Sequence, residues 1–191
     1  STRAATQPAP VARMLVEPPA QLTLLGASGE QTTLITEAIA QFDQAGLVLP
    51  PLLIEFHNTP TGCKGHSGLY RPASATNNRP VDRIDLCNPM KIIALHELAH
   101  AYHHRVLKFK DPTITAAFKN IVASKKYEKV KHADGKTKRH YALTDEKEYF
   151  SECTEAYFGR NDFFPFTRAE LKSYDPKGYA MVETIWKTSN N

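Results

Sequence analysis

The first ninety residues contain short apolar runs, and the rest of the chain contains longer apolar patterns with a helical period. Each short run lies near glycine or proline and predicts a strand, over residues 22–25, 52–56, 69–71 and 81–86. In the last of these runs apolar and charged side chains alternate, which is typical of a half-exposed strand. The first part of the chain is therefore expected to form a small sheet.

Apolar positions spaced by three to four residues predict helices over 33–45, 91–107, 112–126 and 146–158, and two short helices separated at Asp175 and Pro176. Thr32 or Thr33 is expected to cap the first helix, and Gly46 to end it. Asn88 and Pro89 mark the start of the second helix, because asparagine caps and proline fits a first turn. Strands followed mainly by helices predict an α+β fold with a small mixed sheet.

Composition is that of one folded domain with an extended arm. The chain has 191 residues, 41% of them apolar and 23% charged, which argues against wholesale disorder. Residues 1–21 are rich in proline, alanine and threonine and predict an arm, which leaves 22–191 as a single domain. No run of 18 apolar residues occurs, so we expect no membrane span, and we expect a monomer.

The net charge of +4 comes from one segment. Residues 119–139 contain eight basic and two acidic side chains, so the rest of the chain carries a charge of −2. Within this segment, residues 127–142 predict a basic hairpin that turns at Asp134 and Gly135. Aromatic residues are scarce around the basic ones, so nucleic acid is not the expected partner.

Three cysteines bear on the compartment. Cys63 and Cys87 lie in loop or strand sequence and form the expected disulfide of a secreted protein, whereas Cys153 lies in a helix expected to be buried. The alternative is three reduced thiols in a cytosolic protein. Because the sequence begins at Ser1 without a signal peptide, we expect a mature form that is secreted or otherwise extracytoplasmic.

Residues 96–100 read His-Glu-Leu-Ala-His and carry the main chemical signal. On a helix, His96 and His100 lie on one face about 6 Å apart along the axis, so both imidazoles can reach one metal ion. Glu97 can then take a proton from a water at that ion. His103 and His104 are too far along the helix to join it and are expected at the surface or close behind the ligands.

A catalytic zinc ion needs a third protein ligand. Glu148, Glu152 and Glu155 share one face of the helix predicted over 146–158, beside aromatic residues that indicate partial burial. Buried carboxylates need a cation or hydrogen-bond donors. We therefore expect Glu148 to be the ligand and Glu152, one turn on, to accept a hydrogen bond from a ligand histidine. Glu155 is the competing candidate for either role.

These segments resemble the catalytic domain of the gluzincin group that contains the anthrax lethal factor and clostridial Pro-Pro endopeptidases. In that group the third ligand opens a Glu-[Phe/Tyr]-Phe-Ala-Glu sequence, and residues 148–152 here read Glu-Tyr-Phe-Ser-Glu. The group also carries a tyrosine seven residues earlier that assists catalysis, which corresponds to Tyr141. The resemblance covers roughly residues 91–158 and implies a zincin-like fold, but it does not carry a substrate preference.

The function expected from the sequence is that of an endopeptidase with one catalytic zinc (Zn2+), acting on a protein or peptide. Glu97 is its general base, and Tyr141 stabilises the oxyanion, with His140 as the second candidate. The strand over 81–86 is expected at the sheet edge that pairs with substrate. The basic hairpin either flanks the substrate groove and favours acidic peptides or is solvated and remote. The alternative function is a zinc-binding effector or binding module without peptidase activity.

Overall fold

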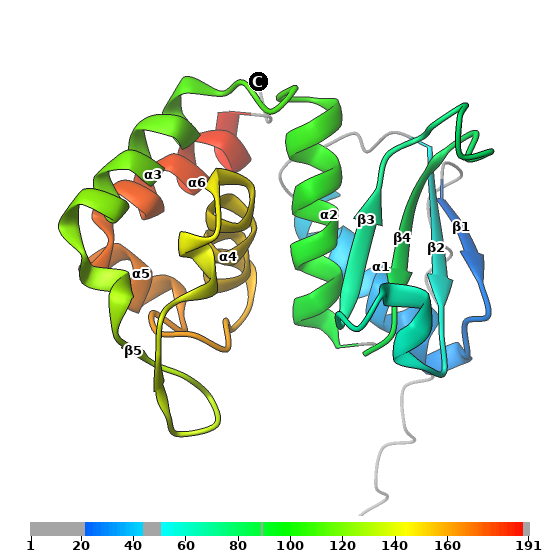
Figure 1. The fold of residues 1–191 in the computed structure, drawn as a ribbon, viewed down its shortest axis with the longest axis horizontal. Coiled ribbons are helices and arrows are strands. Elements are labelled where there is room, and N and C mark those ends of the chain that lie inside the picture. The colour runs from blue at the N-terminus through cyan, green and yellow to red at the C-terminus, as the bar shows by residue number, and fades with distance from the viewer. Residues whose placement is uncertain (1–21, 44–50, 89, 189–191) are drawn as a thin grey trace, which may run out of the picture.

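The computed structural model describes residues 22–43, 51–88 and 90–188, which form a mixed α+β fold (Figure 1). The arm predicted over 1–21 lies outside the described residues. The sheet half contains β1 (Leu22–Leu25), α1 (Gly29–Asp43), β2 (Leu52–Phe56), a 3₁₀ turn (Pro60–Cys63), β3 (Gly68–Arg71), β4 (Asp82–Leu86) and α2 (Lys91–Arg105). The helical half contains α3 (Pro112–Ser124), β5 (Val130–Lys131), β6 (Thr137–Lys138), α4 (Glu146–Phe158), α5 (Arg168–Tyr174) and α6 (Pro176–Thr188), with 3₁₀ turns at Lys126–Glu128 and Tyr141–Leu143.

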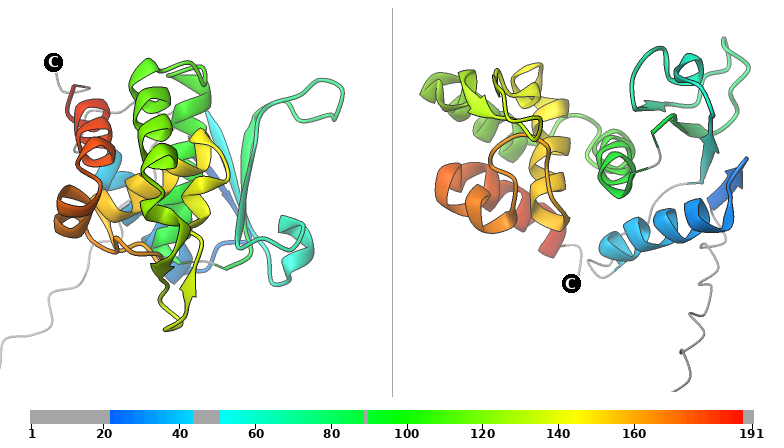
Figure 2. Two further views of the ribbon diagram at one scale, coloured as in Figure 1. Left: turned by 60° about the vertical axis from the view of Figure 1, so that its left-hand side comes forward. Right: turned by 90° about the horizontal axis from the view of Figure 1, so that it is seen from below.

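The sheet has the strand order β1-β2-β4-β3. β1, β2 and β4 are parallel, and β3 pairs with β4 in the antiparallel direction. The prediction that the strand over 81–86 lies at the sheet edge is therefore wrong, because this strand is β4 and it pairs with a neighbour on both sides. The edge strands are β1 and the short strand β3, and β3 is the one that lies beside α2 (Figures 1 and 2).

The alternating pattern of β4 also misled the prediction of its exposure. Asp82 and Asp85 are 3% and 0% exposed, although the pattern predicted a half-exposed strand. Arg105 forms an ion pair with Asp82, and Arg71 and Arg83 form ion pairs with Asp85. These guanidinium groups supply the charge and the donors that a buried carboxylate requires. The alternation therefore reflects internal ion pairing rather than contact with solvent.

Most helices begin and end close to their predicted positions, and the differences have local causes. α1 begins at Gly29, four residues early, because Ser28 and Gln31 exchange hydrogen bonds between side chains and backbone amides. Its predicted end at Gly46 lies outside the described residues. α3 ends at Ser124 because Lys125 takes a left-handed conformation with φ 56°. α4 spans its predicted residues, with Asp145 accepting hydrogen bonds from two amides of the first turn.

Helix α2 stands between the two halves of the molecule (Figure 2). It packs against α1 and β3 on one side and α4 on the other, so most of its middle residues are buried. Met90 occupies its cap position without a side-chain hydrogen bond, so Asn88 does not cap it as predicted; Pro89 lies outside the described residues. Helix α2 ends at Arg105, two residues before the predicted end. A histidine pair on α2 therefore faces groups from both halves.

Two further predictions concern cross-links and membranes. A disulfide joins Cys63 to Cys87 as expected, and Cys153 is a buried free thiol. The basic hairpin turns at Gly135, although its strands are only two residues long. None of the helices in the described part of the chain is both long and apolar enough to cross a membrane.

Candidate metal centre

His96 and His100 come together on one face of α2, as their spacing predicts. Their Nε2 atoms are 3.0 Å apart, and their rings meet edge to face at 4.7 Å between centroids. His96 is 8% exposed, so one of the two imidazoles is almost enclosed. The pair therefore presents two nitrogen atoms to a single point beside the helix.

Glu148 brings the third potential ligand from α4. Its Oε2 lies 2.9 Å from Nε2 of His96 and 3.4 Å from Nε2 of His100. Ligand atoms at roughly 2.0–2.1 Å from a tetrahedral zinc ion are about 3.3 Å from one another. The three atoms thus outline a triangle close to one face of such a tetrahedron. Among the described residues they form a group that could hold a metal ion.

The charges of this group are strongly coupled. Burial favours the neutral form of Glu148, but hydrogen bonds from His100 and His96 outweigh it and hold the pKa of the carboxyl well below its usual range. Burial acts against the charged form of His96, yet the carboxylates of Glu148 and Glu155 raise its pKa well above 6.5. An ionised Glu148 is the form that can bind a metal.

The outer nitrogens of both histidines are held by α4. Nδ1 of His96 lies 2.6 Å from Oε1 of Glu155, and Nδ1 of His100 lies 3.2 Å from Oγ of Ser151. The partner predicted for a ligand histidine, Glu152, is 3.7 Å from Nδ1 of His96. Glu155 therefore makes the short contact and Glu152 does not, which corrects the prediction.

Helical geometry explains this exchange. Seven residues return a helix to within about 20° of the starting direction, whereas four residues overshoot by about 40°. Glu155 thus points almost where Glu148 does, and the spacing in the sequence could have favoured it. Glu152 is turned toward Asn161, whose Nδ2 donates to its Oε2 at 2.9 Å.

The two buried carboxyls behind His96, those of Glu152 and Glu155, both have a raised pKa. Burial raises the pKa of Glu155 to about 7, although the hydrogen bond from His96 opposes the shift. Burial and the charge of Glu155 raise the pKa of Glu152 well above its usual range. The hydrogen bond from His96 thus favours the ionised form of Glu155, while burial beside Glu155 favours the neutral form of Glu152.

Glu97 is fixed against the edge strand. Its Oε2 accepts a hydrogen bond of 2.7 Å from the backbone amide of Tyr70, and it is only 6% exposed. A Cβ atom at Gly68 would lie 2.9 Å from Cγ and Oε1 of Glu97 and 2.7 Å from Cγ2 of Ile93. Gly68 therefore allows the carboxylate to lie against β3. Neither Gly68 nor the Tyr70 amide was predicted, because strand pairing decides which strand meets the helix.

Tyr141 and His140 are neighbours in the sequence with different surroundings. Tyr141 is 41% exposed, and its ring centroid lies 6.4 Å from that of His96. Burial and the charge of Glu148 raise its pKa, so its hydroxyl remains a hydrogen-bond donor. His140 is 2% exposed, accepts a hydrogen bond from the amide of Ala142 and has a pKa lowered by burial to about 3. A neutral, enclosed His140 does not suit the oxyanion role for which it was the second candidate.

His103 and His104 stay outside the ligand group, as expected, but neither is simply at the surface. His103 is 1% exposed and packs between the rings of Phe109 and Phe150. Its Nδ1 has no hydrogen-bond partner in the part of the chain that the structure describes. Nδ1 of His104 lies 2.9 Å from the hydroxyl of Tyr70 and so links the end of α2 to β3.

Comparison with protein-family models, with curated proteins and with solved structures finds no match to this chain. The interpretation of the centre therefore rests on its residues and their geometry. The described residues contain two further groups of three potential ligands. One consists of His96, Glu152 and Glu155 and shares its histidine with this centre. The other, Glu55, His57 and Asp85, lies in the sheet half. Its carboxylates are already paired with arginines, whereas the group on α2 has no arginine partner among the described residues.

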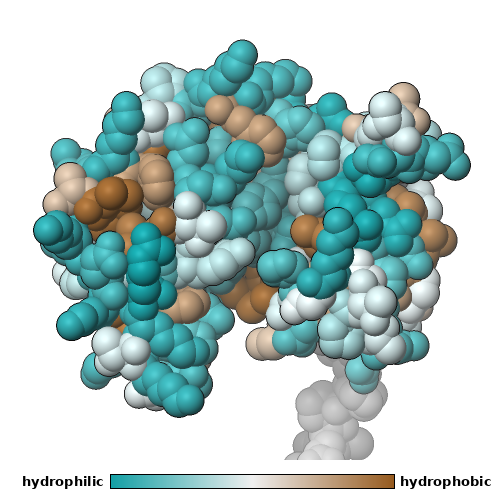
Figure 3. All heavy atoms as spheres, in the orientation of Figure 1, coloured by the Kyte–Doolittle hydropathy of each residue, from teal (hydrophilic) through white to brown (hydrophobic). Residues whose placement is uncertain are grey.

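Two cavities flank the three ligands, and both are lined by His66, Gly68, His96, Glu97 and Tyr141. The acidic cavity, of about 270 Å³, is further lined by Ile92, Ile93, Glu152, Glu155, Asp162 and Phe163. The aromatic cavity, of about 440 Å³, is further lined by Leu69, Tyr70, His100, Phe109, Lys147 and Glu148. They form a groove past the ligands, and the surface between the two halves is mainly hydrophilic (Figure 3).

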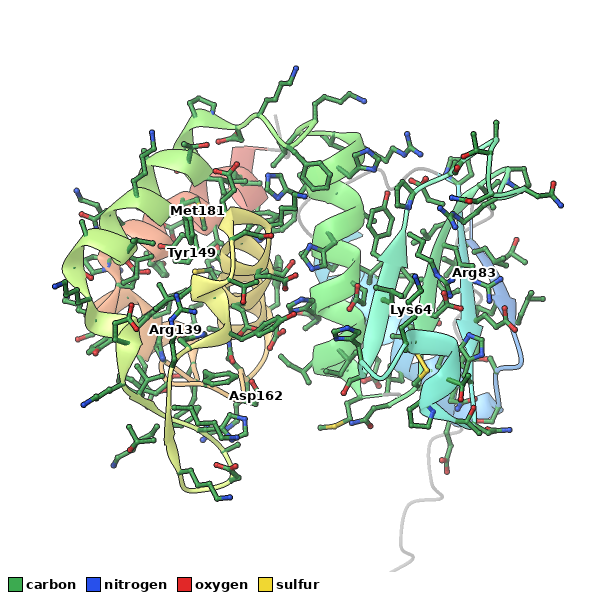
Figure 4. The ribbon with its side chains drawn as sticks, in the orientation of Figure 1. Lys64, Arg83, Arg139, Tyr149, Asp162 and Met181 are labelled. Atoms are coloured by element: carbon green, nitrogen blue, oxygen red, sulfur yellow. A yellow bond between two sulfur atoms is a disulfide. The ribbon has the colours of Figure 1, made fainter. Side chains whose placement is uncertain are left out.

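The basic segment lies away from this groove. None of residues 119–139, all of which the structure describes, lines either cavity. Arg139 lies farther out in the helical half, whereas Asp162 lies on the side that faces α2 (Figure 4). His132 and Ala133 of this segment contact two residues that line the acidic cavity: His132 forms a β-bridge with Phe163 and lies 3.4 Å from the Asp162 carboxylate, and the amide of Ala133 donates to the Asp162 carbonyl. This placement favours the solvated hairpin over one that selects acidic substrates.

Proposed function

We propose that the protein is a zinc-dependent endopeptidase of the gluzincin type, with a zincin-like arrangement of one domain. The observation that carries the proposal is the triangle of His96, His100 and Glu148 beside an open groove. A catalytic zinc takes three protein ligands of this kind and keeps one position for water or substrate. The outer contacts of both histidines with α4 match those that orient ligands in zinc sites.

The chemistry divides among three groups. When bound, a zinc ion would polarise the scissile carbonyl and acidify a water. Glu97, held by the Tyr70 amide, takes the proton of the attacking water and delivers it to the leaving amine. Tyr141, which faces both cavities, donates its hydroxyl proton in a hydrogen bond to the oxyanion that develops on the scissile carbonyl.

The edge strand β3 favours a peptide as the substrate. Gly68 and Tyr70 of β3 line the groove, and the amide of Tyr70 points toward Glu97 rather than toward β4. An extended peptide can add to such an edge through backbone hydrogen bonds, which places its carbonyl groups beside the ligands. We therefore propose β3, rather than β4, as the strand that receives substrate.

The disulfide supports an extracytoplasmic location. Cys63 and Cys87 join the loop before β3 to the end of β4, so the bond braces the edge strand. Structural disulfides persist in oxidising compartments and are rare in the cytosol. We propose that the peptidase acts outside the cytoplasm, as a monomer.

A peptide-library digest tests the peptidase. The zinc-loaded protein is incubated with peptides of randomised sequence, and new N-termini are detected by mass spectrometry. We expect cleavage that a chelator stops and zinc restores, and a kcat in Glu97→Gln lower by about 10²–10⁴-fold with zinc content unchanged. Stoichiometric zinc without cleavage by the wild type would instead favour a zinc-binding module.

A further inference from the structure

The acidic cavity lies directly beside the three ligands, and we propose that it binds a lysine or arginine side chain adjacent to the scissile bond. This inference rests on the proposed peptidase function and names its class of substrate. The cavity shares His96, Glu97 and Tyr141 with the ligand region. A peptide held with its scissile carbonyl at that centre must place a neighbouring side chain at or in this cavity.

The walls of the acidic cavity suit a long side chain with an apolar stem. Ile92 and Ile93 of α2 line one part and Phe163 another. The volume of about 270 Å³ is well above the ~10–15 Å³ that one water molecule needs. Lysine and arginine bury their methylene stems against apolar surface while the charged end seeks polar partners. The cavity offers both kinds of surface within one space.

Among the described residues no lysine or arginine pairs with its carboxyl groups, whose basic neighbours are the histidines His96 and His132. Glu97, Glu152, Glu155 and Asp162 line the cavity, and neither lysine nor arginine does. Glu152 and Glu155 are 5% and 4% exposed. Oε1 of Glu155 lies against His96, and among the described residues its Oε2 receives no hydrogen bond. A buried side chain that leaves one carboxylate oxygen open to a cavity and without a donor favours a ligand that brings one.

Asp162 provides a charge at the mouth of the cavity. Its side chain is 54% exposed, and it lies 3.4 Å from Nε2 of His132. It is placed where the helical half faces α2 (Figure 4). A cationic side chain would thus meet an exposed carboxylate first and buried carboxyls further in. A negative side chain would meet repulsion along the same path.

The aromatic cavity on the other side of the ligands differs in charge. Lys147 lines it, with its ammonium group 4.7 Å from the centre of the Phe109 ring. The preference for a basic residue is therefore confined to one side of the scissile bond. A peptide with the basic residue on the other side of that bond is expected to gain nothing from it.

Peptide pools test this inference, each with lysine, arginine, norleucine or glutamate fixed at one position and the other positions randomised. We expect kcat/KM for the lysine and arginine pools to exceed that for norleucine at least about tenfold, and glutamate to be poorest. Asp162→Asn should reduce the lysine-to-norleucine ratio about threefold. Glu128→Gln, which alters an exposed carboxylate paired with Arg139 in the basic segment, should leave the ratio unchanged.

A binding measurement separates this inference from the peptidase itself. Fluorescence anisotropy of the same pools with zinc-loaded Glu97→Gln reports affinity without cleavage. Tighter binding of the lysine pool with no hydrolysis by the wild type would refute the peptidase and support the cavity. Cleavage that favours norleucine would support the peptidase and refute the proposed binding of a basic side chain in the cavity. A second bound zinc that is lost in Glu152→Gln, together with no lysine preference, would make the cavity a metal site and overturn the inference.

Discussion

The candidate metal centre and a second group of three potential ligands on the sheet lie in different parts of the described structure, and of these two only the centre is arranged for a metal. His96, His100 and Glu148 meet where α2 faces α4, whereas Glu55, His57 and Asp85 meet on the sheet. On the sheet, Arg83 pairs with both carboxylates, and Arg71 also pairs with Asp85. Nε2 of His57 lies 2.6 Å from the same aspartate.

The difference shows that the neighbours of a ligand group matter as much as the group. A divalent ion at the sheet group would have to displace two guanidinium groups from Asp85, which is 0% exposed. At α2, the only charged partners of Glu148 among the described residues are the two histidines, which become neutral ligands when they bind metal. The sheet group is therefore a structural ion-pair network, and the α2 group is the metal candidate.

Removing one ligand from each group gives the largest contrast. Glu148→Ala is expected to abolish stoichiometric zinc binding and with it all activity, because two histidines alone leave the centre incomplete. His57→Ala is expected to retain one zinc per protein. Elemental analysis after gel filtration measures both, with circular dichroism to establish that each variant folds. Two zinc ions in the wild type, or loss of zinc from His57→Ala, would contradict the contrast.

The outer contacts of His96 allow a finer test. Glu155→Gln is expected to weaken zinc binding by about 10–100-fold, because the carboxylate that orients His96 and raises its basicity becomes neutral. Glu152→Gln is the matched control on the same helix, and it should change affinity less, since its oxygen is 3.7 Å from Nδ1. Competition with a chromophoric chelator measures the affinities. The reverse ranking would restore the role to Glu152.

The sequence predicted those parts of the centre that depend on local geometry. The four-residue spacing of His96 and His100 fixes their common face once a helix forms, and the helix carrying Glu148 has clear capping signals. The prediction of Glu152 failed although the helix was right, because a three-residue difference in position changes the direction of the side chain. Periodicity shows which face is shared, but not which residue meets a partner on another helix.

Tertiary pairing limited the rest of the prediction. Strand order placed β4 inside the sheet and β3 at its edge, and nothing in either local pattern specifies a neighbour. Asp82 and Asp85 resemble solvent-facing residues until Arg105 and Arg71, distant in the sequence, are brought beside them. The same strand pairing places Gly68 against Glu97, so the role of Gly68 could not be predicted from the sequence.

Gly68→Ala tests whether the edge strand positions Glu97. The new methyl group would approach Cγ and Oε1 of Glu97 at 2.9 Å, so the carboxylate must shift. A displacement of this kind is expected to lower kcat by about 10-fold or more while zinc content stays unchanged. Steady-state kinetics and elemental analysis on the same sample measure both quantities.

Two further variants show which contact matters. Gly29→Ala serves as the control, because a Cβ atom there meets nothing within 4 Å, and its kcat should equal that of the wild type. Adding Ile93→Ala to Gly68→Ala removes the clash at 2.7 Å but leaves the one with Glu97. The double variant should therefore remain slow. Recovery of kcat in it would assign the effect to Ile93 packing instead.

His103 provides the smallest effect and contrasts a buried histidine with the two ligands beside it. Burial, with a smaller contribution from the charge of His100, lowers its pKa to about 4, and its Nδ1 has no hydrogen-bond partner among the described residues. Because the unfolded chain takes up a proton near pH 6.5, the free energy of unfolding should fall as pH drops from about 6.5 toward 4. His103→Phe removes both the unpaired nitrogen and this titration. It should raise stability by about 1 kcal/mol at pH 7, with a larger gain at pH 5.

Urea unfolding of the chelator-treated proteins at pH 7 and pH 5 measures this gain. The comparison uses metal-free samples so that proton competition at the ligands is the same in both proteins. His66→Gln alters an exposed histidine and should leave the pH dependence as in the wild type. Equal losses of stability between pH 7 and 5 in the wild type and His103→Phe would show that His103 does not titrate on unfolding. The acid sensitivity would then belong to other groups, with His140 the next candidate because burial lowers its pKa to about 3.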